Sequence, residues 1–100
     1  MRPWRRTGRF SSGPTALAAD PARNARHIAK VLFVFALLER GSMRVEEIPT
    51  YLESVPGYRL LSEPFLGQAP GDMSGWLLAD LRRSSAVGVV AGLVHPRMPA

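Results

Sequence analysis

The 100-residue chain contains no cysteine, and its first 19 residues contain no acidic side chain. Without cysteine the fold has neither disulfide bonds nor a cysteine-ligated zinc site, and the chain fits a reducing compartment, so we expect a cytoplasmic protein. Long hydrophobic runs are also missing. Residues 31–38 form an apolar stretch that is far too short to span a bilayer. We therefore expect no membrane-spanning segment.

The sequence also lacks the common motifs of catalysis. It has no Gly-Lys-Ser/Thr phosphate loop, no His-Glu-x-x-His pair and no Gly-x-Ser-x-Gly elbow. His27 and His95 are not accompanied by a convergent set of carboxylates, so we expect no metal site and no cofactor. Glu46 and Glu47 are adjacent and would point in different directions on a helix. We expect a protein that is not an enzyme.

The charge is distributed unevenly along the chain. The net charge is +5, but residues 1–30 carry seven basic side chains against Asp20 alone, which is a local +6. Residues 31–100 carry six basic and seven acidic side chains, a local −1. This asymmetry indicates a basic arm on a nearly neutral domain, and basic arms bind phosphate or acidic surfaces.

Residues 1–19 are the predicted arm. Prolines and glycines interrupt them and no apolar period appears, so we expect this segment to be disordered. Trp4 and Phe10 stand among the arginines, a mixture that stacks on bases while pairing with phosphates. An inert tail and an organelle-targeting peptide remain alternatives, because the segment is rich in arginine and free of acid. The arginines of the arm are Arg2, Arg5, Arg6 and Arg9.

A long helix is predicted between Asp20 and Gly41. Asp20 followed by Pro21 is typical of a helix start, and a glycine readily ends a helix. One stripe at three- and four-residue spacing is expected to face the core. It consists of Ile28, Val31, Leu32, Phe35 and Leu38. The opposite side is apolar too, and we expect its residues to contact residues 58–66, a protein partner or a second copy in a homodimer. These residues are Phe33, Val34 and Leu37.

Two further helices and a hairpin are predicted after Gly41. A second helix is expected to begin at about Glu46 and to end before Pro56, with Pro49 tolerated in its first turn. Residues 56–72 contain several Pro-Gly breaks and are predicted to be an anchored loop. A third helix is expected to be capped by Asp72 or Ser74 and to run to about residue 85. Residues 87–95 are predicted to form a short β-hairpin that turns at residues 91–92.

This order of elements resembles a winged helix-turn-helix domain over about residues 28–95. The stretches that carry the resemblance are "LLERGS" at the end of the first helix, "VEEIPTYL", "SGWLLADLRRSSAV" and the wing "GVVAGLVHP". The long segment 56–72 and Pro49 depart from the usual pattern of the class. The resemblance implies an α+β fold of three helices followed by a hairpin. The predicted domain covers residues 20–96, with a tail at residues 97–100.

The resemblance also implies a function. In this class the third helix enters the DNA major groove while the wing contacts the backbone or the minor groove. We therefore expect a small regulatory protein, acting in transcription regulation, that binds duplex DNA. One of Arg82 and Arg83 is expected to contact DNA, and the other is expected to stabilise the negative C-terminal end of the third helix. The expected DNA-binding residues are Arg2, Arg5, Arg6, Arg9, Ser74, Arg82, Arg83 and Arg97. The alternative is a non-catalytic interaction subunit whose long helix docks on a partner or a second copy.

Overall fold

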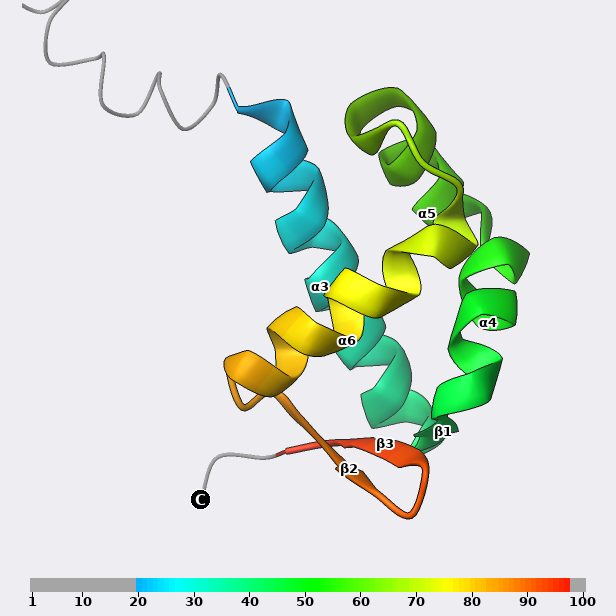
Figure 1. Cartoon of the computed structure of the whole chain (residues 1–100), viewed down its shortest axis with the longest axis vertical. Coiled ribbons are helices and arrows are strands. Elements are labelled where there is room, and N and C mark those ends of the chain that lie inside the picture. Colours follow the sequence, from blue (N-terminus) through cyan, green and yellow to red (C-terminus); the bar gives the residue numbers. More distant parts are fainter. Residues whose placement is uncertain (1–19, 98–100) are drawn as a thin grey trace, which may run out of the picture.

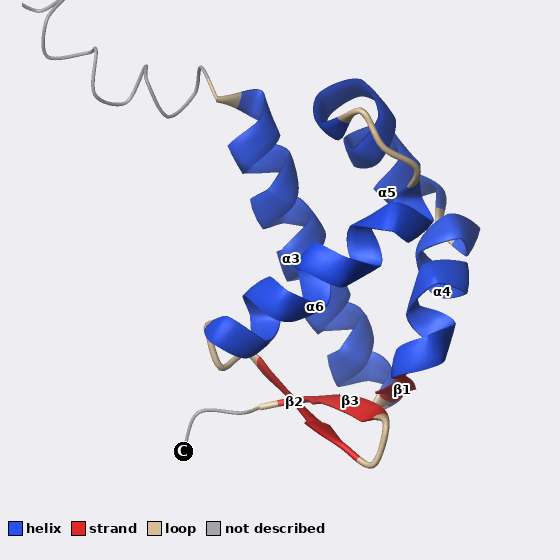
Figure 2. Ribbon diagram, in the orientation of Figure 1, coloured by secondary structure: helices blue, strands red, loops and turns tan. Residues whose placement is uncertain are grey.

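The computed structural model describes residues 20–97, which form an α+β fold of four α-helices and a small antiparallel sheet (Figures 1 and 2). The α-helices are α3 (Pro21–Arg40), α4 (Ile48–Ser54), α5 (Pro56–Leu61) and α6 (Ser74–Arg83), and the strands are β1 (Met43–Arg44), β2 (Val87–Val90) and β3 (Leu93–Pro96). Figure 1 shows α6 crossing in front of α3, with the sheet closing one end of the helical layer. No helix among residues 20–97 is both long and apolar enough to cross a membrane.

Both predicted ends of the long helix are confirmed. The Asp20 side chain accepts a hydrogen bond from the Arg23 backbone N–H at 3.0 Å, and Pro21 occupies the first turn, where a missing N–H costs nothing. At the other end Gly41 has a φ of +89° and donates its N–H to the Leu37 carbonyl at 2.7 Å. The sequence signals at these two positions therefore determine the length of α3.

The face that α3 turns to the core is the opposite of the predicted one. The buried positions follow one another at four-residue intervals, whereas every member of the predicted core stripe is at least 39% exposed. The buried residues are Ala25, Ala29, Phe33 and Leu37. Both faces are apolar, so hydrophobic periodicity could not distinguish them. The two alanines mark the face where neighbouring elements approach α3 closely, because a methyl group takes little room between packed backbones.

Of the contacts expected for Phe33, Val34 and Leu37, those with a partner protein or a second copy are therefore corrected. The expected packing against residues 58–66 agrees with the structure, because α3 contacts α5 and residues 62–66, and Tyr58 belongs to the same core. Phe33 and Leu37 are 0% exposed inside the core, and Val34 is half-buried against it. The Phe33 ring packs edge-on against Tyr51 of α4, with 6.1 Å between the ring centroids. Phe33 and Leu37 hold the domain together and offer no surface for docking, whereas Val34 also lines a pocket between α3 and the end of α6.

Residues 56–72 are largely helical, and the prediction of a loop is wrong. Pro56 is the first residue of α5, where a proline is tolerated. A π-helical turn, η3 (Ser62–Leu66), follows α5 and contains Pro64, and Gly67 ends it in the left-handed conformation. These elements anchor the segment through Tyr58, which is 1% exposed, while Leu60 remains 70% exposed.

The second and third predicted helices begin differently from expectation. A 3₁₀ turn, η2 (Val45–Glu47), leads into α4, and Pro49 does lie in the first turn. Another 3₁₀ turn, η4 (Pro70–Met73), leads directly into α6, so neither Asp72 nor Ser74 caps α6 through its side chain. A continuous run of helical turns replaces the predicted cap.

The predicted hairpin is confirmed, and a third strand joins it. β3 lies in the middle of the sheet, between β2 and the two-residue β1, in the order β1-β3-β2. Val94 of β3 is paired with Met43 on one side and with Val89 on the other. Met43 and Val94 are buried beneath the end of α3. The sheet thereby ties the chain after α3 to the C-terminal hairpin.

The hairpin turn places an alanine in an unfavourable conformation. Ala91 and Gly92 both have positive φ, +53° and +78°. A two-residue turn with two positive φ values matches the twist of the strands, but only glycine, asparagine and aspartate adopt it readily. The Cβ of Ala91 therefore strains the turn.

We predict that Ala91→Gly raises the free energy of unfolding by about 0.5–1 kcal/mol, because it removes this strain. The matched control is Ala79→Gly on the exposed side of α6, which should lower the free energy of unfolding by about 0.5–1 kcal/mol. Urea denaturation of both variants measures the difference. Equal effects of the same sign would show that Ala91 is not strained.

We also predict that Phe33→Ala lowers the free energy of unfolding by about 3–5 kcal/mol, because it empties a fully buried site. Phe35→Ala, two residues further along the same helix, should change it by less than about 1 kcal/mol in dilute solution, since that ring is 61% exposed. Thermal denaturation compares the pair. A larger loss for Phe35→Ala would contradict the orientation of α3.

Candidate nucleic-acid interface

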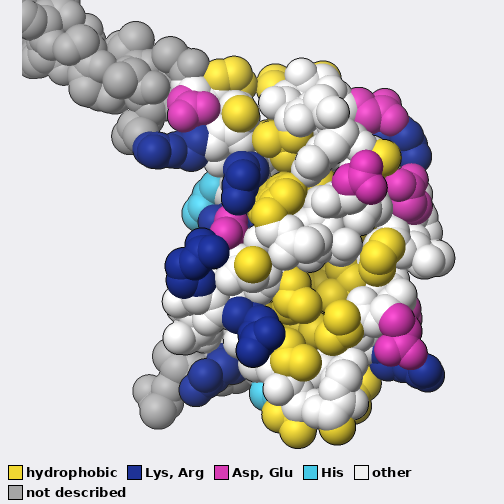
Figure 3. All heavy atoms as spheres, viewed as in Figure 1, with side chains coloured by type: hydrophobic (Ala, Val, Ile, Leu, Met, Phe, Trp, Pro, Cys, Tyr) yellow, Lys and Arg dark blue, Asp and Glu magenta, His cyan; other side chains and the backbone are white. Residues whose placement is uncertain are grey.

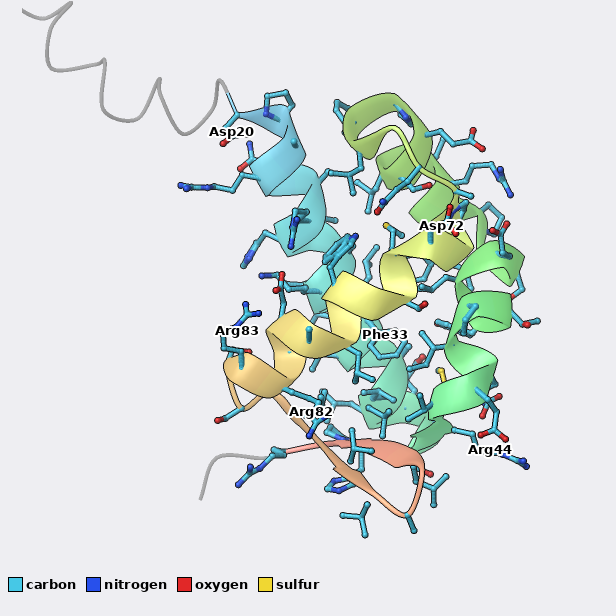
Figure 4. The ribbon with its side chains drawn as sticks, viewed as in Figure 1. Asp20, Phe33, Arg44, Asp72, Arg82 and Arg83 are labelled. Carbon is cyan, nitrogen blue, oxygen red and sulfur yellow. The ribbon has the colours of Figure 1, made fainter. Side chains whose placement is uncertain are left out.

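The outer face of α6 is the first part of the candidate interface. Leu77 and Leu81 point inward and are buried, which turns the other side of the helix to solvent. Figure 4 shows Arg82 directed toward the sheet and Arg83 at the C-terminal end of α6. The remaining exposed residues of this face are Gly75 and Ala79. Their small side chains keep the face low, so that a flat or grooved ligand could approach the helix closely.

A shallow pocket of about 390 Å³ lies between α6 and the start of α4. Apolar side chains are visible beside α6 on this side of the molecule in Figure 3. Arg82 and the half-buried Ser74 are the polar side chains of the lining. The full lining is Val45, Ile48, Pro49, Ser74, Gly75, Leu78, Ala79 and Arg82. The structure thus brings Ser74 and Arg82, both predicted site residues, to one surface.

Arg82 and Arg97 differ from the other cations of the described chain. Every other Lys or Arg among residues 20–97 forms an ion pair with a carboxylate, whereas these two form none. Both residues are exposed. The Arg97 backbone N–H donates to the Ala86 carbonyl at 2.9 Å, which fixes the chain as it leaves β3. Two guanidinium groups are thus available for an external anion.

Arg83 has a structural partner. Its guanidinium donates to Asp80 at 2.9 Å, one turn earlier on α6. Of the two adjacent arginines, Arg82 is therefore the one without a carboxylate partner, and Arg83 serves the fold. Arg26 and Lys30 of α3 also reach Asp80, at 3.0 Å and 3.7 Å. This cluster was not expected from the sequence, although the four-residue spacing of Arg26 and Lys30 places both on one side of a helix.

The cluster around Asp80 joins α3 to α6. The Asp80 side chain is only 13% exposed, and the hydrogen bond from Arg26, together with those from Arg83 and the charge of Lys30, holds the pKa of its carboxyl below the ordinary value. The Arg26 guanidinium also lies 4.3 Å from the centre of the Trp76 ring. Three cations around one carboxylate leave a local charge of +2 at this edge.

Basic side chains gather at one edge of the molecule. In Figure 3 the Lys and Arg side chains are concentrated along the left edge, over the first half of α3 and the C-terminal end of α6. Most Asp and Glu side chains lie on the opposite edge, over α4 and α5, together with other arginines. Arg2, Arg5, Arg6 and Arg9 lie outside the described residues. Within residues 20–97, no group of three or more His, Asp or Glu side chains is arranged to hold a metal ion.

We predict that Asp80→Asn lowers the free energy of unfolding at pH 7 by about 1–2 kcal/mol, because it removes charge-assisted bonds between α3 and α6. The folded-state pKa of Asp80 lies below its unfolded value of 3.8, so this contribution is present above pH 3.8 and is lost as the pH falls through the lower, folded pKa. Denaturation at several pH values measures the difference in the free energy of unfolding between the parent chain and the variant. A difference in the free energy of unfolding that does not shrink in acid would contradict the stabilising role of the ionised Asp80 carboxylate.

No protein-family model matches the chain, and neither a curated protein nor a solved structure is significantly similar to it.

Proposed function

We propose that this chain is a winged-helix-type domain that binds duplex DNA and acts in regulation. The observation that carries the proposal is the pair of cations without carboxylate partners, Arg82 on the outer face of α6 and Arg97 at the end of β3. The resemblance of the sequence assigns these two elements to the major groove and the wing. Arginines that are free of internal partners bind phosphate or a guanine edge without first breaking an ion pair.

The order of elements supports the same proposal. A long helix, a short strand, helical turns and two short helices, α4 and α5, precede α6, and a hairpin follows it. The first strand pairs with the last, so that the hairpin is held beside the start of α4 and the end of α3. The major groove of B-DNA is about 12 Å wide and admits a single helix. The small side chains of Gly75 and Ala79 would let α6 enter such a groove deeply.

The N-terminal segment adds electrostatic affinity under this proposal. Residues 1–19 carry four arginines and no acid, whereas residues 20–97 carry nine basic and eight acidic side chains. The domain alone would therefore attract DNA only weakly through its net charge. The arm would supply most of the binding that does not depend on sequence, and α6 with the hairpin would set the position on the duplex.

A second candidate function is a non-catalytic interaction subunit. The exposed apolar stripe on α3 favours it, since five large apolar side chains on one helix face are more than a domain of this size needs to expose. The apolar hairpin tip also supports this candidate, because the uncharged side chains of Val90 and Leu93 are 64% and 40% exposed. DNA-binding experiments separate the two candidates.

We predict that the full chain binds duplex DNA and that Arg82→Ala weakens this binding. If Arg82 neutralises a phosphate, the slope of log K against log salt should become shallower by about 0.9. Arg59→Ala is the matched control, because Arg59 is paired with Glu53 and Glu63 and lies on α5, outside both α6 and the hairpin. Fluorescence anisotropy at two or more salt concentrations measures both affinity and slope. The control should bind like the parent chain.

Removal of residues 1–19 should also weaken binding, with a slope shallower by up to about 3–4 units, and should leave the melting temperature unchanged. Full-length protein that ignores duplex DNA at low salt would overturn the proposal and leave the interaction subunit as the better candidate. Equal losses for Arg82→Ala and Arg59→Ala would show that α6 does not face the duplex.

A further inference from the structure

The exposed side of α3 carries a continuous apolar stripe that the domain itself leaves uncovered. Its members are between 39% and 61% exposed, and Phe35, near the middle, is the most exposed. The stripe spans eleven residues, or about 15 Å along the helix. It consists of Ile28, Val31, Leu32, Phe35 and Leu38.

The spacing of the stripe is that of a helix-pairing seam. Ile28, Val31, Phe35 and Leu38 follow one another at intervals of three, four and three residues, which matches about one and a half of the seven-residue repeats of a coiled coil. The buried face of the same helix has a different spacing, of four residues throughout from Ala25 to Leu37. The stripe is therefore suited to another helix.

The stripe is also symmetric about its own midpoint. Ile28 and Leu38 lie five residues on either side of Phe33, and Val31 and Phe35 lie two residues on either side. Antiparallel pairing with an identical helix would therefore place Ile28 against Leu38 and Val31 against Phe35, twice over. Leu32 of each copy would lie near the two-fold axis. We propose that a second copy of this chain docks antiparallel on this stripe, giving a homodimer with one self-complementary interface.

The available area is of the size that a dimer needs. At about 200 Å² for a fully exposed side chain of this kind, the stripe presents roughly 450 Å² per copy. A stable interface buries about 800 Å² per partner, of which about two thirds is apolar in homodimers. The stripe supplies most of that apolar part, and the polar residues that flank it on α3 supply the rim.

Glu39 gives a second, electrostatic reason for antiparallel pairing. It is exposed, lies in the last turn of α3 and forms no ion pair within residues 20–97. A carboxylate there faces the negative end of its own helix dipole, which is unfavourable. In the antiparallel dimer Glu39 lies level with residue 27 of the other copy, close to the positive N-terminal turns of that helix. Pairing in the parallel direction would instead leave both Glu39 side chains at the same end of the dimer, beside the negative ends of both α3 dipoles.

The first test is the mass of the full chain in solution, by light scattering coupled to size exclusion. The expected mass is twice the 11.0 kDa of one chain. Phe35→Glu should raise the dissociation constant of the dimer by about tenfold or more, because it puts a charge into the centre of the seam. Leu60→Glu is the matched control, since Leu60 is 70% exposed on α5 and lies outside the stripe. Circular dichroism shows that each variant is folded.

The second test uses the absence of cysteine, which makes every introduced thiol unique. Leu32→Cys should cross-link to itself with a short bismaleimide, because the two copies meet near the axis. Ile28→Cys alone should not, since the two thiols would be about 15 Å apart along the helices. A mixture of Ile28→Cys and Leu38→Cys chains should cross-link. This pattern distinguishes the antiparallel from the parallel arrangement.

Three outcomes would overturn the proposal. A full-length chain that is monomeric at high micromolar concentration, and becomes dimeric only without residues 1–19, would show that the arm covers the stripe. A dimer that Phe35→Glu and Leu60→Glu affect equally would use another surface. Efficient cross-linking of Ile28→Cys to itself would mean parallel pairing. DNA binding is measured separately and uses the outer face of α6, so the failure of one proposal leaves the other intact.

Discussion

The structure depends on how one helix, apolar on all sides, is covered by a chain too short to cover it completely. α3 buries the face of Ala25, Ala29, Phe33 and Leu37, and α6, the helical segment 56–66 and the sheet all pack on that face. A domain of about 80 described residues has too little further chain to enclose the other side. The exposed stripe is thus a direct result of the composition of α3. Exposing one apolar helix face costs less free energy than exposing the residues of the buried core.

Electrostatics reinforces the same arrangement and limits the surfaces left for ligands. Asp80 of α6 attracts Arg26 and Lys30 of α3, so that the crossing of the two helices is held by charge as well as by apolar packing. Since most Lys and Arg side chains among residues 20–97 are paired with carboxylates, little of the positive charge is free to bind an external anion. The two unpaired arginines are informative for that reason: their guanidinium groups form no ion pair with a carboxylate of residues 20–97.

The sequence predicted the parts of the fold that depend on local chemistry. Asp20 and Gly41 set the ends of α3, and the hairpin of residues 87–96 follows from its β-branched strands and short turn. Features set by tertiary packing were not accessible. Two apolar faces on one helix gave no basis for choosing the buried one, and the face that was predicted to be buried is the exposed one. β1 is only two residues long and exists because β3 pairs with it. The Asp80 cluster joins residues more than 50 positions apart, and single-residue patterns carry no signal for such a contact.

The two proposed surfaces lie on different sides of the molecule, which constrains how they could work together. α6 packs on the buried side of α3, and its C-terminal end borders the stripe at Val31 and Phe35. A dimer formed through the stripe would leave the outer faces of its two α6 helices pointing away from the interface. One duplex would then contact one copy at a time, and a dimer would hold two duplexes, or two distant segments of one. This differs from the arrangement in which paired recognition helices read adjacent half-sites about one helical turn apart. If both proposals hold, the protein is better suited to bridging DNA than to reading a compact palindrome.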